Sequence, residues 1–193
     1  TLVILTSDHG DQDGSHRLEH KEVLYEESIR IPFIVSWKGV TSAGAVDRTH
    51  LVSNGLDLIP TLCDFAGVQK PSSLRGRSVR ALAEGGSASG WRTSLVIENH
   101  IQRLVHDGRW KYYAGWKSKH AAGSCGMCPS RIKDGWDGGR VREMLIDLEN
   151  DPGEMTNLAV RSQHAAQLKR SRRMLVEWCR EHDVALESEY MAG

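Results

Sequence analysis

The first ten residues, TLVILTSDHG (Thr1–Gly10), decide the fold class. Leu2–Leu5 is an unbroken apolar run, and Val3 and Ile4 within it are branched at Cβ. An apolar run that does not alternate with polar residues predicts a strand buried on both faces, as in a parallel sheet covered by helices. Ile31–Val35 predicts a second strand of this kind. Two strands cannot make a doubly covered sheet, so we expect the rest of it to lie upstream or to come from another chain.

The composition of the 193 residues excludes several classes of protein. Lys plus Arg (25) equals Asp plus Glu (25), so the formal charge is zero and indicates no attraction to nucleic acid or to an anionic membrane surface. A hydrophobic content of 39% and a charged content of 26% are typical of a folded chain. The apolar runs reach only about five residues, too short for a transmembrane helix. Four cysteines are too few for a disulfide scaffold.

Downstream, the pattern predicts the end of an α/β domain and then a small antiparallel sheet with a closing helix. We expect an α/β part over residues 1–90 and a second part over 91–193, with a loop insertion at 115–140. The expected elements are a short helix near Lys21–Glu27, a helix over Asn54–Ala66 ended by Gly67, strands over Thr93–Ile97, Gln102–His106, Trp110–Ala114 and Met144–Leu148, and a helix over Ser162–His182.

Two polar residues at the carboxyl end of the first strand suggest a metal site. Ligands of open α/β sheets bind at this end of the strands. Asp8 and His9 can both reach one divalent cation there because Gly10 permits a turn. A carboxylate oxygen suits Ca²⁺, Mg²⁺ or Mn²⁺, and an imidazole nitrogen suits Zn²⁺ or Mn²⁺. Lys21, at the expected start of a helix, suits a tetrahedral oxyanion, and His16 is a further donor. Taken singly, each is more often a surface residue.

Several separated stretches of the chain together resemble the sulfatase family. The agreement extends from residue 1 to about residue 160, apart from the insertion at 115–140, in the order, spacing and type of residue. The matching stretches are Thr6–Gly10, Gly14–His16, Lys21, Tyr25–Pro32, Val52–Leu62, Asp107–Tyr112, Leu148–Glu154 and Thr156–Ala159.

The resemblance implies an alkaline-phosphatase-like α/β fold and the hydrolysis of sulfate esters or sulfamates. In that family the nucleophile is a formylglycine hydrate formed near the N-terminus, and Ca²⁺ binds upstream aspartates and an Asp followed by Asn or His. By that mapping Asp8 and His9 are metal ligands, Lys21 contacts the sulfate, and His16 lies on the active-site loop where it can touch substrate. Ca²⁺ is the expected cofactor, ahead of Mn²⁺, Mg²⁺ or Zn²⁺. Family members are periplasmic, secreted or lysosomal.

One cysteine-containing stretch, Cys128–Arg131 (CPSR), looks at first like the family's modification motif. The motif requires a cysteine two residues before the proline, and Met127 occupies that position. We therefore expect that Cys128 is not the nucleophile and that the 193 residues do not contain one. Cys125 and Cys128 form a C-x-x-C pair, for which a loop disulfide or two free thiols are favoured over half of a zinc site.

The leading hypothesis is thus the C-terminal portion of a sulfatase that acts on a sulfated small molecule or sugar. It would supply metal and sulfate ligands, with the missing N-terminal half of the enzyme as its partner, and would be inactive alone. The alternatives are a phosphodiester or phosphonate hydrolase of the same superfamily, in which His also replaces Asn, and a non-catalytic assembly module. Neither a nucleic acid nor a membrane span is expected.

Overall fold

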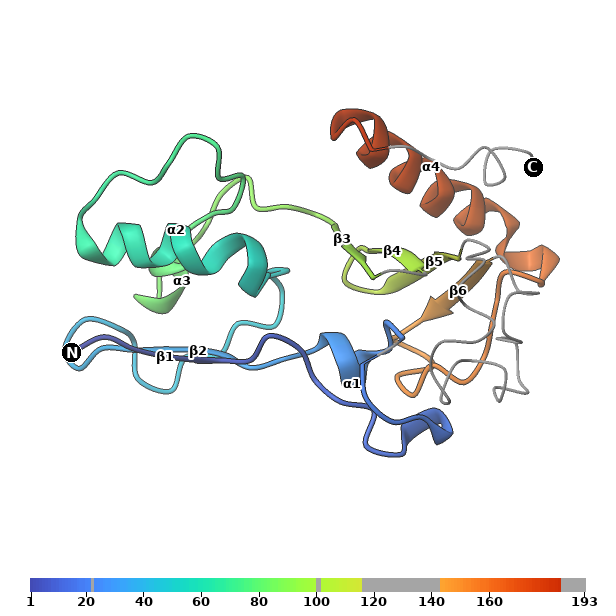
Figure 1. Ribbon diagram of the computed structural model, residues 1–193, viewed down its shortest axis with the longest axis horizontal. Coiled ribbons are helices and arrows are strands. Elements are labelled where there is room, and N and C mark those ends of the chain that lie inside the picture. The colour runs from blue at the N-terminus through green and yellow to red at the C-terminus, as the bar shows by residue number, and fades with distance from the viewer. Residues whose placement is uncertain (22, 100–101, 116–142, 185–193) are drawn as a thin grey trace. The chain divides into compact units, whose positions relative to one another are not determined.

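The computed structural model describes residues 1–21, 23–99, 102–115 and 143–184 (Figure 1). The chain forms two compact units, the first made of residues 1–10 and 30–93 and the second of residues 11–29 and 94–193. Apart from Gly115, the expected insertion at 115–140 lies outside the described residues, and so does the pair of Cys125 and Cys128.

The first unit contains both apolar runs as strands, β1 (Val3–Thr6) and β2 (Phe33–Ser36). The expectation of a parallel sheet is wrong for this pair, because β1 and β2 pair antiparallel, with Leu5 opposite Ile34. The covering of both faces in the complete protein stays a prediction. Val3, Leu5 and Ile34 are 53–56% exposed, whereas the alternate side chains are half-buried. Within the described residues of this unit, one face of the strand pair is therefore half-buried and the other is exposed.

Helix α2 (Asn54–Ala66) has the predicted limits, and α3 (Arg80–Ala83) follows it in the same unit. Gly67 ends α2 in the left-handed conformation (φ 68°), which glycine adopts without steric cost. The Phe65 ring lies 5.8 Å from that of Trp37, just beyond β2.

One carboxylate joins three parts of the first unit. The side chain of Asp57, on α2, is fully buried. It accepts hydrogen bonds from the backbone N–H of Ser53 (2.8 Å) and of Arg77 (2.9 Å). Arg92 donates to it through both terminal nitrogens, each at 2.6 Å. The Asp57 carboxylate therefore connects the start of α2 with the chain before α3 and with the end of the unit.

The acid stability of this unit is expected to depend on Asp47. Its carboxylate accepts the backbone N–H groups of Thr49 (2.8 Å) and His50 (2.9 Å), and lies 2.6 Å from His50 Nδ1. Burial acts to raise the pKa of Asp47, but these hydrogen bonds outweigh it and lower the pKa from 3.8 to about 2. Because the pKa falls on folding, the stabilisation is complete above about pH 4 and is lost as the pH falls towards 2.

Asp47→Asn should therefore lower the melting temperature at neutral pH and flatten its decline between about pH 4 and pH 2. Melting curves followed by circular dichroism across this range would measure both effects. Asp64→Asn serves as a control because its carboxylate is 45% exposed. An acid limb as steep in Asp47→Asn as in the unaltered chain would contradict the prediction.

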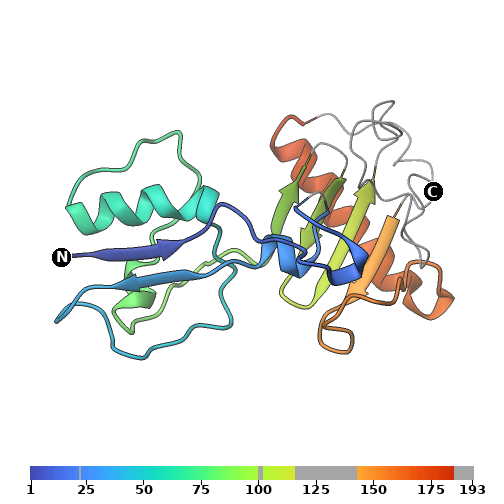
Figure 2. The ribbon, with the colours of Figure 1, turned by 60° about the horizontal axis from the view of Figure 1, so that its bottom comes forward.

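The second unit contains a four-stranded antiparallel sheet in the order β3-β4-β5-β6, as the sequence predicts (Figure 2). The strands are β3 (Leu95–Glu98), β4 (Gln102–His106), β5 (Trp110–Gly115) and β6 (Glu143–Asp147), and the helices are η1 (Ser15–Arg17), α1 (Glu26–Ile29), η3 (Ser162–His164) and α4 (Ala165–Glu181). Asp107 and Gly108 form the expected turn between β4 and β5, where Gly108 has a φ of 96°.

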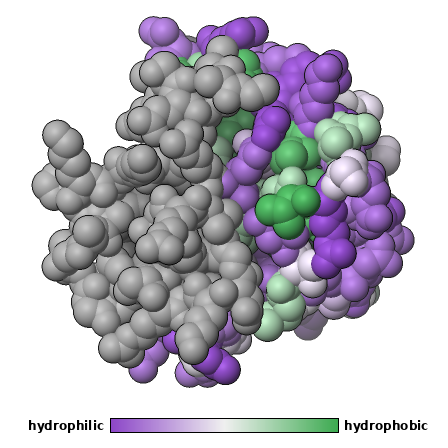
Figure 3. Space-filling view, turned by 90° about the vertical axis from the view of Figure 1, so that its right-hand side faces the viewer, coloured by the Kyte–Doolittle hydropathy of each residue, from purple (hydrophilic) through white to green (hydrophobic). Residues whose placement is uncertain are grey.

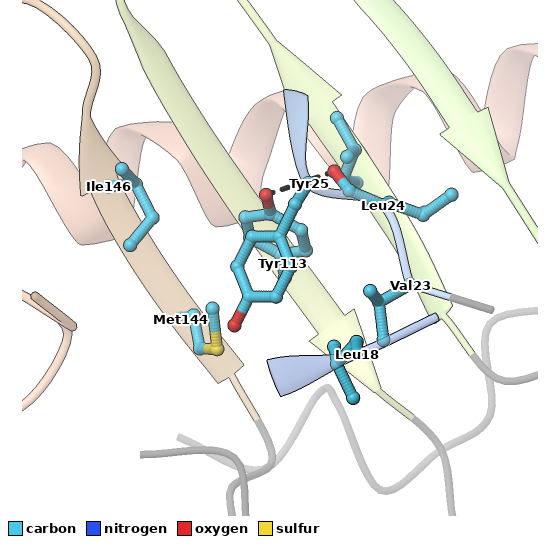
Figure 4. Close-up of a cluster of buried hydrophobic side chains, with 8 residues drawn as sticks. Leu18, Val23, Leu24, Tyr25, Tyr113, Met144 and Ile146 are labelled. Atoms are coloured by element: carbon cyan, nitrogen blue, oxygen red, sulfur yellow. Dashed lines mark hydrogen bonds between the residues drawn. The ribbon is translucent and has the colours of Figure 1, made fainter. Parts of the chain in front are cut away.

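The two faces of this sheet bury different partners because side chains alternate along each strand. One face packs against α4, as predicted, with Leu168, Leu175 and Cys179 buried and Trp178 partly buried. The other face packs against the chain before α1, and its cluster consists of Leu18, Val23, Leu24, Tyr25, Leu104, Tyr113, Met144 and Ile146 (Figure 4). The segment 11–29 is thus part of the core of the second unit.

This packing corrects one expectation. Lys21 was expected at the start of a helix near Lys21–Glu27, but α1 begins only at Glu26 and Lys21 lies in a turn. Val23 and Leu24 are buried in the sheet cluster, and the chain turns into a helix only after them. The segment 11–29, which precedes β2 in the sequence, packs with the second unit. The domain limits 1–90 and 91–193 stay a prediction.

Exposed apolar side chains are concentrated in the first unit. Of the large hydrophobic residues that are exposed in the described chain, only Met155 and Val160 belong to the second unit. The others are Val3, Leu5, Ile34, Val40, Val46, Leu56, Ile59, Leu62 and Val68. Figure 3, a view from the right-hand side of Figure 1, shows mainly hydrophilic side chains among the described residues. Among those residues, no helix has the length and apolar character needed to cross a membrane.

Candidate active site

The predicted metal pair lies immediately after β1. The Asp8 side chain is 83% exposed and that of His9 is 36% exposed. Asp8 Oδ1 accepts the backbone N–H of His9 at 3.0 Å, and Asp8 Oδ2 lies 3.3 Å from His9 Nε2. The two side chains therefore turn towards each other, with a carboxylate oxygen and an imidazole nitrogen side by side.

The ring of His9 is oriented by its other nitrogen. His9 Nδ1 lies 2.6 Å from the carbonyl oxygen of Gly10. A carbonyl oxygen can only accept a hydrogen bond, so Nδ1 carries the proton that it donates. In the neutral ring this leaves the lone pair on Nε2, the atom beside the Asp8 carboxylate. A backbone hydrogen bond of this kind is the usual support of a metal-binding histidine.

Asn54 holds the backbone of the metal pair and was not predicted as a site residue. Its amide nitrogen donates to the carbonyl oxygens of Ser7 (2.7 Å) and Asp8 (3.3 Å). Asn54 is the first residue of α2, so the helix start fixes the turn that follows β1. In the sequence, Asn54 looks like part of the start of a helix. No local pattern predicts its contact with Ser7, which lies 47 residues earlier in the chain.

The donor pair fits a divalent cation. Two ligands that each lie about 2.4 Å from one Ca²⁺ at right angles are about 3.4 Å apart. The separation of 3.3 Å between Asp8 Oδ2 and His9 Nε2 is close to that value. Within the described ranges, no group of three or more His, Cys, Asp or Glu side chains is placed to hold a metal ion. The pair thus supplies two ligands, and further ligands would have to come from outside this group.

The two remaining predicted residues, His16 and Lys21, lie in a tightly folded loop of the second unit. The backbone N–H of Gln12 donates to the carbonyl of His20 at 2.9 Å, so the loop closes at the residue before the exposed Lys21. Four of its non-glycine residues have left-handed backbones, Asp13 (φ 44°), His16 (54°), Arg17 (60°) and His20 (62°). Such conformations are costly and persist where the surroundings impose them, often at functional sites.

His16 is held by aromatic stacking. Its ring lies 3.9 Å from that of Tyr25 with an interplanar angle of 7°, and its side chain is only 7% exposed. His16 Nε2 is 3.9 Å from Glu27 Oε2. Burial, with the charges of Glu154 and Glu27 adding to it, raises the pKa of Tyr25 well above its usual value of 10, so its phenol stays neutral. Figure 4 shows Tyr25 beside Tyr113 on the sheet face.

Two buried acceptors in the same segment have no hydrogen-bond partner among the described residues. They are Gln12 Oε1 and Glu27 Oε2. The other end of the Gln12 amide donates to Ser28 Oγ at 2.6 Å, which joins the loop to α1. Buried oxygens without a donor are uncommon in folded proteins.

The four predicted site residues form two pairs, one in each unit. Asp8 and His9 lie side by side in the first unit, while His16 and Lys21 share a loop of the second unit. The convergence of Lys21 with the metal pair stays a prediction.

A model of a known protein family matches residues 14–120, just over half of the chain, and is described as "N-sulphoglucosamine sulphohydrolase, C-terminal". The chain belongs to the sulfatase family. This confirms the resemblance on which the sequence interpretation depends, together with the alkaline-phosphatase-like α/β fold.

Individual relatives agree with this family. The chain is 29% identical over 187 residues to the Delta 4,5-hexuronate-2-O-sulfatase of Bacteroides thetaiotaomicron. That alignment covers 92% of the present chain and 34% of the relative. It is 28% identical over 185 residues to the multifunctional alkaline phosphatase superfamily protein PehA of Trinickia caryophylli, an alignment that covers 94% of the present chain and 35% of PehA. The solved structure of a 2-O GAG sulfatase covers the whole chain with a TM-score of 0.76 and 25% identity, and is itself covered to 40%. The chain thus spans about a third of the length of the curated relatives it matches.

Proposed function

We propose that the complete protein hydrolyses sulfate esters and that these 193 residues are the C-terminal part of that enzyme. The observation that carries the proposal is the Asp8–His9 pair, in which two metal-binding atoms lie 3.3 Å apart after β1, in a chain of the sulfatase family. Asp8 and His9 are proposed as metal ligands, and Lys21 as the contact to the sulfate.

The chemistry of each residue type supports these roles. Asp8 supplies a charged oxygen ligand and His9 a neutral nitrogen ligand whose Nδ1–H is engaged by Gly10. We propose Ca²⁺ as the metal, ahead of Mn²⁺, Mg²⁺ or Zn²⁺. When bound, Ca²⁺ supplies positive charge close to the sulfate oxygens and favours deprotonation of the attacking hydroxyl. The Lys21 ammonium would pair with a sulfate oxygen as a compact point charge. A contact to the substrate is also proposed for His16, whose side chain is 7% exposed.

The partner that completes this site is proposed to be the N-terminal portion of the same enzyme. The relatives are about three times as long as this chain. The strands β1 and β2 leave Val3, Leu5 and Ile34 exposed on one face, as expected where further elements of an α/β domain pack. That portion would also supply the nucleophile, since CPSR at Cys128–Arg131 has the wrong spacing for the modification motif.

A sulfated sugar is the proposed class of substrate. Two relatives of the chain are named for such substrates, a hexuronate-2-O-sulfatase and an N-acetylglucosamine-6-O-sulfatase. The alternative is a phosphate or phosphonate ester, favoured by the similarity to a multifunctional member of the alkaline phosphatase superfamily. Comparing the hydrolysis of an aryl sulfate, an aryl phosphonate and a phosphodiester by the complete enzyme would decide between them.

The 193 residues alone should not hydrolyse an aryl sulfate, because they lack the nucleophile and part of the metal site. Co-expression with the N-terminal portion should produce turnover, and mass spectrometry of the purified native protein should find both portions. Assays of the isolated chain and of the combined protein at saturating Ca²⁺ measure this directly. Turnover by the isolated chain, or an inactive combined protein that carries formylglycine, would refute the proposal.

A further inference from the structure

Three of the stretches that carry the family resemblance, none of which has a role in the proposed site, meet in one buried ionic cluster. Glu26 comes from α1, Lys111 from β5, and Glu154 from the turn after β6. Lys111 Nζ lies 3.0 Å from Glu26 Oε1 and 2.7 Å from Glu154 Oε1. The Lys111 side chain is fully buried, and that of Glu154 is 1% exposed.

Glu154 connects the sheet to the start of α1. Its Oε2 accepts the backbone N–H of Glu26 at 2.6 Å, and its Oε1 lies 2.5 Å from the hydroxyl of Tyr113. Glu154 itself has a left-handed backbone (φ 52°), in a turn where its N–H donates to the carbonyl of Asp151 at 3.1 Å. The turn thus holds this carboxylate in a fixed position beneath α1.

The same cluster reaches the chain that precedes α1. The Tyr113 hydroxyl is 3.1 Å from the carbonyl of Leu24, the contact drawn in Figure 4. The Tyr113 ring lies 6.2 Å from that of Tyr25, which in turn stacks on His16. A continuous series of contacts therefore runs from Lys111 and Glu154 in the sheet subdomain to the loop that ends at Lys21.

Burial of these charges is hard to explain by stability alone. Removing ions from water is so unfavourable that apolar side chains of similar volume often stabilise a protein equally well or better. A buried ionic cluster does, however, fix one geometry, because each charge requires its own partners in place. Here the partners are in the sheet on one side and in the segment 24–26 on the other.

We propose that Lys111 and Glu154 are positioning residues of the sulfatase site, which hold the segment bearing His16 and Lys21 at a fixed place on the sheet. The inference rests on the proposed function of Lys21. It assigns the C-terminal sheet a part in catalysis through the placement of Lys21, without contact to the substrate.

Hydrogen exchange followed by mass spectrometry on the 193-residue chain tests the positioning directly. In Lys111→Met, the amides of Gln12, Gly14 and Leu18, which are hydrogen-bonded within the loop, should exchange at least about tenfold faster. Glu154→Gln preserves the side-chain shape and should give a smaller change in the same amides, which keeps the test valid if Lys111→Met does not fold.

Arg172→Met is the matched control. Arg172 forms an ion pair with Glu143 that joins α4 to β6. Its removal should speed exchange in α4 and leave the loop amides unchanged. Equal loop exchange in Lys111→Met, Glu154→Gln and Arg172→Met would overturn the proposal, whatever reaction the enzyme catalyses.

Kinetics of the complete enzyme separate the positioning role from the proposed function. Glu154→Gln should lower kcat for an aryl sulfate about tenfold or more at saturating Ca²⁺, with the metal affinity unchanged. Arg172→Met should retain the kcat of the unaltered enzyme. If Glu154→Gln loosens the loop but keeps full kcat, the inference is overturned. If the loop loosens and the unaltered enzyme hydrolyses no sulfate ester, the proposed function fails while the placement of the loop by the cluster is supported.

Discussion

Replacing Lys21 with alanine should lower the turnover of a sulfate ester by the complete enzyme by a factor of about 10²–10³, without a matching loss of metal affinity. The ammonium group is proposed to stabilise charge that develops on the sulfate oxygens, and a neutral methyl group cannot replace it. Steady-state kinetics at several Ca²⁺ concentrations, together with a direct titration of the metal, would separate the two effects. Added Ca²⁺ should not restore the rate.

Asp8→Ala is the matched comparison, because its carboxylate is proposed to act through the metal. This variant should bind Ca²⁺ more weakly, and excess Ca²⁺ should restore part of the rate. The contrast follows from the different chemistry of a carboxylate ligand and an ammonium group. If both variants lose metal equally and both recover with added Ca²⁺, Lys21 does not contact the sulfate.

Asp57→Ala should have the largest effect on stability, lowering the free energy of unfolding of the first unit by about 3–5 kcal/mol. The substitution leaves the Arg92 guanidinium, which is 15% exposed, without its carboxylate. It also removes the acceptor of two backbone N–H groups, those of Ser53 and Arg77. Urea denaturation followed by fluorescence would measure the loss.

Asp64→Ala, on the same helix, provides the control for this prediction. Asp64 is 45% exposed and its contact to Arg80 is 3.4 Å long, so its removal should leave the urea midpoint nearly unchanged. Similar midpoints for the two variants would show that the Asp57 cluster does not hold the unit together. Because Asn54 projects from the helix start that Asp57 fixes, the Asp57 variant should also weaken metal binding by the complete enzyme.

The sequence predicted those helices and strands that depend on interactions between residues close together in the chain. The helix Asn54–Ala66 was predicted to the residue because its apolar spacing and the glycine after it are both short-range features. The four-stranded sheet and its covering helix were predicted for the same reason. The pairing of β1 with β2 was not, because an apolar run carries no information on the direction of its neighbour. The start of α1 was also missed, since it depends on the packing of Val23 and Leu24 on a sheet about eighty residues later in the chain.

The site shows the same limit. Asp8 and His9 are adjacent in the sequence, so their proximity could be predicted from the turn at Gly10. The support from Asn54, and the cluster of Lys111 with Glu154, depend on contacts between residues far apart in the chain. A buried lysine in a strand looks like an ordinary outward-facing residue until its partners are placed. Such residues are recognised only once the fold brings distant segments together.

The long-range contact between Lys111 and Glu26 has a consequence for the order in which the chain folds. The strands β3, β4 and β5 are joined by short connections, and closing such short loops costs little chain entropy, so their hairpins can form early. The ion pair of Lys111 with Glu26 closes a loop of 85 residues and needs β5 already in place. The segment that bears His16 and Lys21 is therefore expected to acquire its native amide protection in a later kinetic phase than the hairpins. In pulse-labelling experiments this sulfatase chain would gain its sheet first and its proposed sulfate-binding loop last.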